Sequence, residues 1–319
     1  MLNLRFTVWM FLVGVTVLSA GVVPAQDFPN KVIRILATGA GGGGDIVARM
    51  IGQELVSVWG QQLIVDNRND VIANETVAKA PADGYTLLIN STSLWLWPIL
   101  SKTASWDPLR DFAPVTLAIR QPNILVVHGL LPVKSVKELI ALAKARPGEL
   151  NYSTGKIGST THLASELFNS MAGVKIVSIY YKTTAMALND LIGGQVQMMV
   201  SNAAAVTPHI KSGKLKALAV TYTQPTALAP GLPPVSDTLP NYEAVTILGI
   251  FAPAGTPPAI VNRLSQEMGR ALNKTEVKDK LFNIGVDVVG GPSEQLMSAV
   301  KMEISKWGKV IKDAGIKAD

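Results

Sequence analysis

Short runs of β-branched and other apolar residues alternate along the chain with longer segments whose apolar residues recur at helical spacing. Residues 31–38 predict a strand, and residues 45–58 predict a helix after a glycine-rich loop. The same order recurs with a strand at 151–153, a loop at 154–161 and a helix at 162–172. Strands that alternate with helices usually pair with one another, so the pattern predicts an α/β fold with a parallel sheet covered by helices on both faces.

The alternation continues to the end of the chain. Further strands are expected at 63–65, 85–89, 123–127, 176–179, 196–200, 215–220 and 247–252. Further helices are expected at 73–79, 136–145, 186–192, 258–273 and 293–314, the last as one helix or two. Ser135 and Glu138 have the spacing of a capping box at the start of one helix. Residues 224–240 are rich in Pro, Ala and Thr, which predicts a surface connection.

The first 25 residues have the pattern of an export signal. Arg5 precedes an uncharged run over residues 6–23, and Val23-Pro24-Ala25 places small residues at the −3 and −1 positions of a cut before Gln26. The alternative is a retained membrane anchor, because roughly 20 apolar residues span a bilayer. Pro24 at the cleavage position favours removal. We therefore expect a periplasmic protein that is cleaved after Ala25.

Chain length predicts two domains. Cleavage leaves 294 residues, which is 319 minus 25 and more than a single core usually holds. The middle of the chain repeats the strand, loop and helix pattern, and the end returns to the first unit. We predict one domain from residues 26–122 plus 244–319 and a second from residues 123–243, with a cleft between them.

Composition excludes several classes of protein. The chain has no cysteine, so disulfides, thiolate metal sites and cysteine nucleophiles are impossible. Without Arg5 the chain has 28 Lys plus Arg against 23 Asp plus Glu, a formal charge of +5. The lysines are densest in the last predicted helix, where they alternate with apolar residues and indicate a solvated face rather than a nucleic-acid site. The three histidines lack metal spacing and no serine has a G-x-S-x-G elbow, so we expect neither catalytic residues nor a metal or other cofactor.

The glycine cluster at residues 39–44, followed by Asp45, is the sharpest local feature. Gly41, Gly42 and Gly43 allow close approach of a ligand, and free N–H groups at the start of the following helix attract anions. Asp45 is expected mainly as a cap. The cluster also satisfies G-x-G-x-x-G, with Asp66 at the end of the next strand, so a dinucleotide loop and a merely flexible turn remain alternatives.

A second polar loop at residues 153–162 lies at the corresponding strand-to-helix junction of the other domain. Its hydroxyl and N–H groups are expected to face the first loop across the cleft, although at least one hydroxyl should serve only as a helix cap. The candidate ligand contacts in this loop are Thr154, Gly155, Ser159, Thr160 and Thr161. His162 is either a packed neighbour of the cap or a ligand contact.

Three shorter segments also follow predicted strands. Lys182 can neutralise a carboxylate, with Tyr181 beside it. The remaining candidates are Ser91, Thr92, Ser201 and Asn202.

The residues resemble those of the periplasmic binding receptors of tripartite tricarboxylate transporters, also called Bug proteins. The matching segments are 28–31, 39–45, 66–68, 81–87, 111–115, 158–163, 193–196, 209–214, 251–257 and 306–308. The resemblance implies a two-domain Venus-flytrap fold of the type II periplasmic class, with the loops at 41–45 and 154–161 holding a carboxylate. The chain departs from the family at Trp95 and Trp97, which line either an apolar pocket or the core, and at Ser201, where an aspartate is common.

We therefore predict a monomeric receptor that hands a small organic carboxylate to the membrane permease subunits of such a transporter, without catalysis and without nucleic acid. A ligand-sensing co-receptor for a two-component sensor is one alternative. An exported enzyme or nucleotide-binding protein is another.

Overall fold

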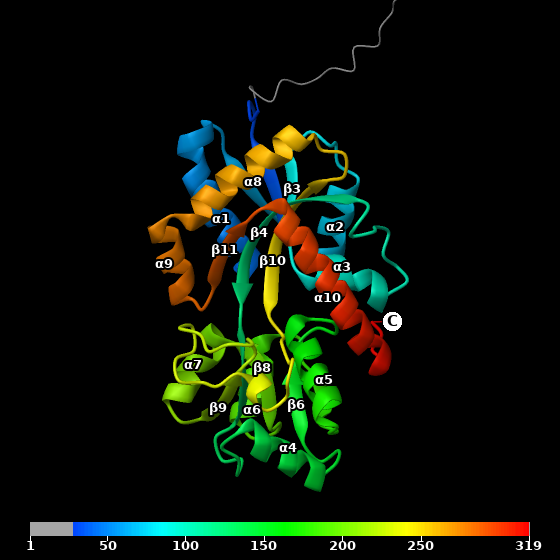
Figure 1. Ribbon diagram of the computed structural model, residues 1–319, viewed down its shortest axis with the longest axis vertical. Coiled ribbons are helices and arrows are strands. Elements are labelled where there is room, and N and C mark those ends of the chain that lie inside the picture. The colour runs from blue at the N-terminus through cyan, green and yellow to red at the C-terminus, as the bar shows by residue number, and fades with distance from the viewer. Residues whose placement is uncertain (1–27, 319) are drawn as a thin grey trace, which may run out of the picture.

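The computed structural model describes residues 28–318 and consists of two α/β units, one above the other in Figure 1. The upper unit contains a six-stranded sheet in the order β11-β4-β10-β3-β1-β2. Its strands are β1 (Ile33–Thr38), β2 (Leu63–Arg68), β3 (Thr86–Asn90), β4 (Phe112–Gln121), β10 (Thr246–Pro253) and β11 (Asp287–Gly291). Its helices are α1 (Gly43–Trp59), α2 (Asp70–Ala78), α3 (Thr92–Leu100), α8 (Pro258–Asn273), α9 (Thr275–Asn283) and α10 (Ser293–Asp313).

The lower unit contains a five-stranded sheet in the order β7-β6-β8-β5-β9. Its strands are β5 (Asn123–His128), β6 (Asn151–Thr154), β7 (Val177–Tyr180), β8 (Met198–Asn202) and β9 (Leu215–Val220). Its helices are α4 (Val136–Ala145), α5 (Thr160–Ala172), α6 (Thr184–Ile192) and α7 (Ala203–Lys211). Ser135 caps α4 as expected, because its side chain accepts from the Glu138 N–H.

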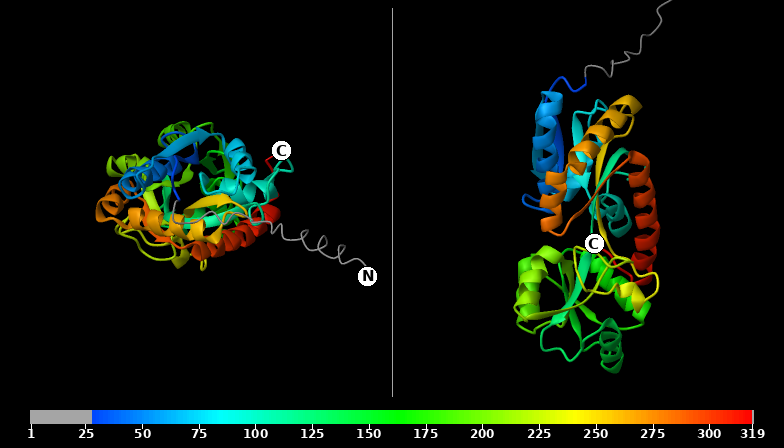
Figure 2. Two further views of the ribbon diagram at one scale, coloured as in Figure 1. Left: turned by 90° about the horizontal axis from the view of Figure 1, so that it is seen from above. Right: turned by 60° about the vertical axis from the view of Figure 1, so that its left-hand side comes forward.

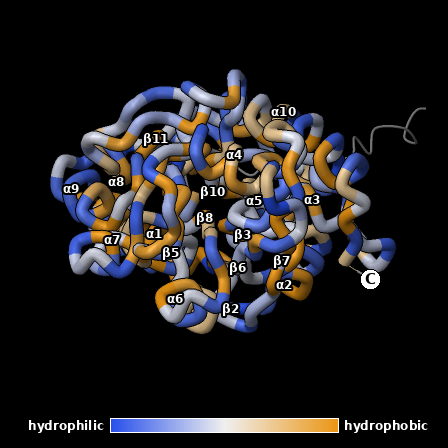
Figure 3. Tube along the Cα trace, turned by 90° about the horizontal axis from the view of Figure 1, so that it is seen from below, coloured by the Kyte–Doolittle hydropathy of each residue, from blue (hydrophilic) through white to orange (hydrophobic). Residues whose placement is uncertain are grey.

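Helices cover both faces of each sheet because successive strand side chains point to opposite faces. On β1, Ile33 and Ile35 belong to the core shared with α1, α8 and α9, whereas Leu36 belongs to the core shared with α2, α3 and α10. On β5, Leu125 packs with α4 and α5, and Ile124 packs with α6 and α7. Hydrophobic and hydrophilic stretches accordingly alternate along the helices in Figure 3.

The chain crosses between the units twice, and the two crossings are hydrogen-bonded to each other. β4 continues into β5 through Pro122, and residues 221–245 lead back to β10. The Thr221 N–H donates to the Asn123 carbonyl at 2.9 Å, and the Ala244 N–H donates to the Thr221 carbonyl at 3.1 Å. Any rotation of one unit against the other must therefore bend the backbone at these residues. Figures 1 and 2 show α10 running down from the upper unit to lie against α5.

The sheets are mixed, so the prediction of a wholly parallel sheet is wrong. β1 is parallel to β2 and β3, but β10 is antiparallel to β3 and β4. In the lower sheet, β5 is antiparallel to β8 and β9. Both β5 and β10 enter their sheets from the other unit, and this reverses their direction.

The sequence pattern does not predict α3, β4, α7, α9 or β11. α3 is apolar at most positions and contains Pro98, so it shows no one-sided stripe. β4 is buried over most of its length and contains Pro114, which argues against a strand. α7 contains Pro208. Local periodicity is weak in elements that are apolar all round or interrupted by proline.

Over residues 28–318, no helix combines the length and the apolar character needed to span a bilayer. The predicted signal segment and its cleavage after Ala25 lie outside the described residues.

Candidate functional site

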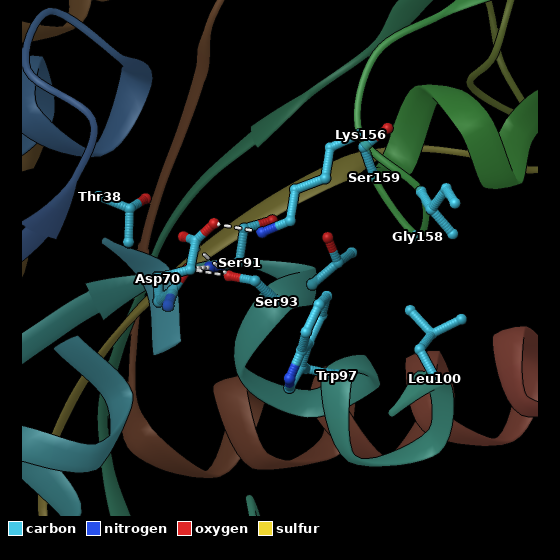
Figure 4. A pocket seen from close by; sticks show the side chains of 12 residues that line it. Thr38, Asp70, Ser91, Ser93, Trp97, Leu100, Lys156, Gly158 and Ser159 are labelled. Atoms are coloured by element: carbon cyan, nitrogen blue, oxygen red, sulfur yellow. Dashed lines mark hydrogen bonds and ion pairs between the residues drawn. The ribbon is translucent and has the colours of Figure 1, made fainter. Parts of the chain in front are cut away.

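A cavity of about 150 Å³ lies between the two units. β1 and β3 end on its upper side, and the loop that follows β6 forms its lower side, so strand ends from both sheets face each other. This is the edge at which α/β sheets usually bind ligands. The lining residues are Thr38, Asp70, Asn90, Ser91, Thr92, Ser93, Trp97, Leu100, Lys156, Ile157, Gly158 and Ser159, shown in Figure 4.

Asp45 holds the glycine loop in shape from its place in the first turn of α1. Its buried carboxylate accepts from the Gly41 N–H at 2.9 Å and from Asn67 Nδ2 at 3.0 Å, and it forms an ion pair with Arg49 at 2.9 Å. The hydrogen bond from Arg49, followed by those from Gly41 and Asn67, holds the pKa of Asp45 below its ordinary value although burial opposes this. Gly41 has a φ of 75°, which other residues rarely adopt.

The glycine loop adjoins the cavity without lining it. Thr38, the last residue of β1, lines the cavity, whereas Gly41, Gly42, Gly43 and Asp45 do not. Gly42 is the N-cap of α1, so the leading N–H groups of this helix have no intrahelical acceptors.

His162 positions the second loop and is a packed neighbour of the cap. Its ring is buried, Nδ1 accepts from the Gly158 N–H at 3.2 Å, and Nε2 lies 3.0 Å from the Tyr180 hydroxyl. Burial lowers the pKa of His162 to about 4. The ring is therefore neutral near pH 7, with its proton on Nε2 because Nδ1 accepts. Ser159 caps α5 by accepting from the His162 N–H at 3.3 Å.

Acid is expected to destabilise the protein through His162. Its folded pKa of about 4 lies below the ordinary 6.5, so the unfolded chain takes up a proton first as the pH falls from 6.5 towards 4. Lowering the pH from 7 to 5 should cost about 2 kcal/mol through this group, since a tenfold change in proton concentration corresponds to about 1.4 kcal/mol. Urea unfolding at both pH values should show this extra loss in the wild type and not in His162→Asn. Equal losses of stability in the wild type and in His162→Asn would contradict this role of His162.

Lys156 and Asp70 form an ion pair across the cavity. Lys156 Nζ, on the loop of the lower unit, lies 2.8 Å from Asp70 Oδ2 at the start of α2. The same ammonium group lies 5.0 Å from the centroid of the Trp97 ring. The Ser93 hydroxyl, whose shorter hydrogen bond is to Asn90 Oδ1, also lies 3.2 Å from Asp70 Oδ1. Figure 4 shows Lys156 reaching over the cavity towards Asp70, with Trp97 below it.

A buried polar network supports the upper wall. Asn90 Oδ1 accepts from the Ser91 N–H at 2.7 Å and from the Ser93 hydroxyl at 2.8 Å. Asn90 Nδ2 donates to Asn74 Oδ1 at 2.7 Å. The network fixes the start of α3, where Ser91 is the N-cap and Thr92 is the first helical residue. Both of these predicted residues line the cavity, as does Ser159 from the other side.

The other predicted contacts lie outside the cavity lining. The Thr154 hydroxyl at the end of β6 is buried and, like that of Ser153, has no partner among the described residues. Gly155, Thr160 and Thr161 belong to the same loop and the first turn of α5. The Tyr181 hydroxyl donates to Asp190 at 2.7 Å, and Lys182 is exposed. Ser201 is buried in β8, and Asn202 caps α7 by accepting from the Ala205 N–H at 3.0 Å.

Sequence reasoning missed Asp70, Asn90 and Lys156 as cavity residues. Lys156 has a signal, because it is a lone charge inside a Gly/Ser/Thr loop. Asp70 shows no such sequence signal, because an acidic residue at the start of a helix usually serves only to interact favourably with the helix dipole.

Comparisons with known proteins agree on one family. A family model described as "Tripartite tricarboxylate transporter family receptor" matches residues 47–316. Rpa4515 from R. palustris, solved with adipate, is 36% identical with a TM-score of 0.79, and the match covers 91% of this chain and 99% of that one. Periplasmic binding protein BugD is 28% identical with a TM-score of 0.76, covering 91% and 99%. MatC from Rhodopseudomonas palustris, with bound malate, is 28% identical with a TM-score of 0.76, covering 89% and 100%.

Proposed function

The chain belongs to the family of tripartite tricarboxylate transporter receptors, and we propose that it captures a small organic carboxylate between its two units and delivers it to the membrane subunits of such a transporter. It is a solute-binding protein with the two-domain α/β fold of type II periplasmic binding proteins, and not an enzyme. Two similar proteins were solved with carboxylates, adipate and malate.

The cavity between the facing strand ends carries this proposal. The α3 and α5 caps, Ser91 and Ser159, both line it, and the leading N–H groups of a helix attract anions. Lys156, which is paired with Asp70, places an ammonium group in the same lining.

The proposed site extends beyond the cavity lining. The buried, unpartnered hydroxyls of Ser153 and Thr154 suit a ligand or an ordered water. We place Gly41, Gly42 and Gly43 at the upper edge of the site. The remaining proposed contacts are Asp45, Gly155, Thr160, Thr161, Tyr181, Lys182, Ser201 and Asn202.

Domain limits and export belong to the same proposal. Residues 26–122 with 244–319 form one domain and residues 123–243 the other, which places both boundaries at the hydrogen-bonded crossings. Signal cleavage after Ala25 delivers the mature chain to the periplasm, where the permease subunits are accessible.

A dinucleotide suits the glycine loop less well than a carboxylate does. Asp66, the carboxylate that a dinucleotide-binding loop would use for a ribose, is paired with Arg68 at 2.8 Å and with Arg34 at 3.8 Å. The Asp45 carboxylate already accepts the hydrogen bond from the Gly41 N–H. A negative charge inside the loop opposes the two charges of a pyrophosphate more strongly than the single charge of one carboxylate.

A thermal-shift experiment on residues 26–319 tests the proposed function. A carboxylate present at a hundred times its Kd should stabilise the folded protein by about 2.7 kcal/mol, because it binds only the folded state, and should raise Tm by several degrees. The panel should contain dicarboxylates, tricarboxylates, ring carboxylates, amino acids and nucleotides. A shift with nucleotides alone would overturn the proposal.

A further inference from the structure

The two tryptophans of α3 have different surroundings. Trp95 is fully buried in the core, with its ring centroid 6.3 Å from that of Phe251. Trp97 lines the cavity. In Figure 4 the indole nitrogen of Trp97 lies at the end of the ring farther from Lys156, so a carbon edge faces the cavity. A carbon edge of an aromatic ring in a binding cavity favours an apolar or aromatic ligand group, because aromatic rings also pack edge to face.

Apolar side chains from both units continue the Trp97 surface. Leu100 follows Trp97 by one helical turn on α3, and Ile157 comes from the loop after β6. The cavity of about 150 Å³ matches the size at which an apolar cavity of about 150 Å³ in another protein binds benzene. One six-membered ring therefore fits between Trp97, Leu100 and Ile157.

The charges of the cavity suit one carboxylate. Among the lining residues, Lys156 is the only cation and Asp70 the only anion. The Ser93 hydroxyl and the start of α2 hold Asp70 in place. A single ligand carboxylate can replace Asp70 as the partner of Lys156. A second ligand carboxylate would face Asp70 without a second cation in the lining, and like charges repel strongly at such sites.

We infer that the ligand is a ring-bearing monocarboxylate whose ring packs against the carbon edge of Trp97 and whose carboxylate replaces Asp70 as the partner of Lys156. The inference rests on the proposed function, because it names the class of carboxylate that the same cavity selects. It also predicts that this receptor discriminates against the chain dicarboxylates bound by Rpa4515 and MatC.

Isothermal titration with benzoate, adipate and malate tests the inference on the unmodified protein first. Benzoate should bind at least about tenfold more tightly than either dicarboxylate, since each ring contact and each unpaired charge contributes at that level. Equal or tighter binding of adipate or malate would overturn the inference and leave the proposed function standing. Binding of none of the three would overturn the inference, and a thermal-shift panel with no response to any carboxylate would overturn the proposed function as well.

Single-residue variants then show which side chains produce the preference for benzoate. Trp97→Leu should weaken benzoate binding roughly tenfold, and Trp97→Phe, which keeps an aromatic ring, should restore most of it. Lys156→Met should weaken benzoate binding at least as much. Asp70→Asn should narrow the preference for benzoate over adipate, because it removes the repelling charge. Lys280→Met, which breaks an exposed pair with Glu276 on α9, is the matched control. Benzoate affinity that is unchanged in both Trp97→Leu and Lys156→Met would overturn the inference.

Discussion

Replacing Gly158 with alanine is expected to weaken carboxylate binding by about fivefold to tenfold. Gly158 lies on the loop of the lower unit, and a methyl group there would overlap Leu100 Cδ1 of the upper unit. Overpacking costs about 1–3 kcal/mol in general, and the low end of this range applies here because Leu100 Cδ1 is the end of a flexible side chain. Because the overlap exists only when the two units are together, it raises the free energy of closing them around the ligand. Titration calorimetry with a bound carboxylate measures it.

Two variants separate this overlap from backbone strain. Gly158 has a φ of 76°, so alanine also lowers stability by about 1 kcal/mol. Gly173, the C-cap of α5, has a φ of 60° and open space around it, so Gly173→Ala should lower stability without changing affinity. Because Leu100 also lines the cavity, its single variant is measured alongside, and Gly158→Ala should cost much less affinity in a Leu100→Ala background than in the wild type. An equal cost in both backgrounds would show that the overlap with Leu100 is not the cause.

Replacing Asp45 with alanine is expected to lower the free energy of unfolding by about 3 kcal/mol. The substitution leaves the Gly41 N–H, Asn67 and Arg49 without their shared acceptor. Hydrogen bonds to charged groups contribute about 1.5–3 kcal/mol each, and exposed Arg49 recovers part of its loss in water. Urea unfolding measures the effect. Carboxylate affinity should fall as well, because the glycine loop beside the cavity loses its support.

The Asp45 contribution also has a predicted pH dependence. Its pKa is lowered in the folded protein, so its stabilisation is present above its ordinary pKa and is lost as the pH falls through the folded pKa. Glu276→Ala, which removes an exposed carboxylate, is the control and should leave stability unchanged. An Asp45→Ala protein as stable as this control would show that the carboxylate does not hold the loop.

Local sequence determined the repeated strand, loop and helix units. The β1 strand, the glycine loop and α1 follow from an apolar run, residues that tolerate positive φ, and helical spacing. Ser135 and Ser159 cap their helices because each hydroxyl lies three residues before a backbone N–H that has no acceptor within the helix. These features depend on interactions within a few residues, which periodicity and residue type describe directly.

Only the tertiary structure decided which of these segments come into contact. Local pattern could not show that β10 enters its sheet in reverse, because that direction follows from its return from the lower unit. Trp95 and Trp97 have the same residue type two positions apart, and only packing buries one and places the other at the cavity. Asp70 and Lys156 are 86 residues apart. Their pairing depends on how the two units pack across a cleft, and no short-range pattern encodes that arrangement.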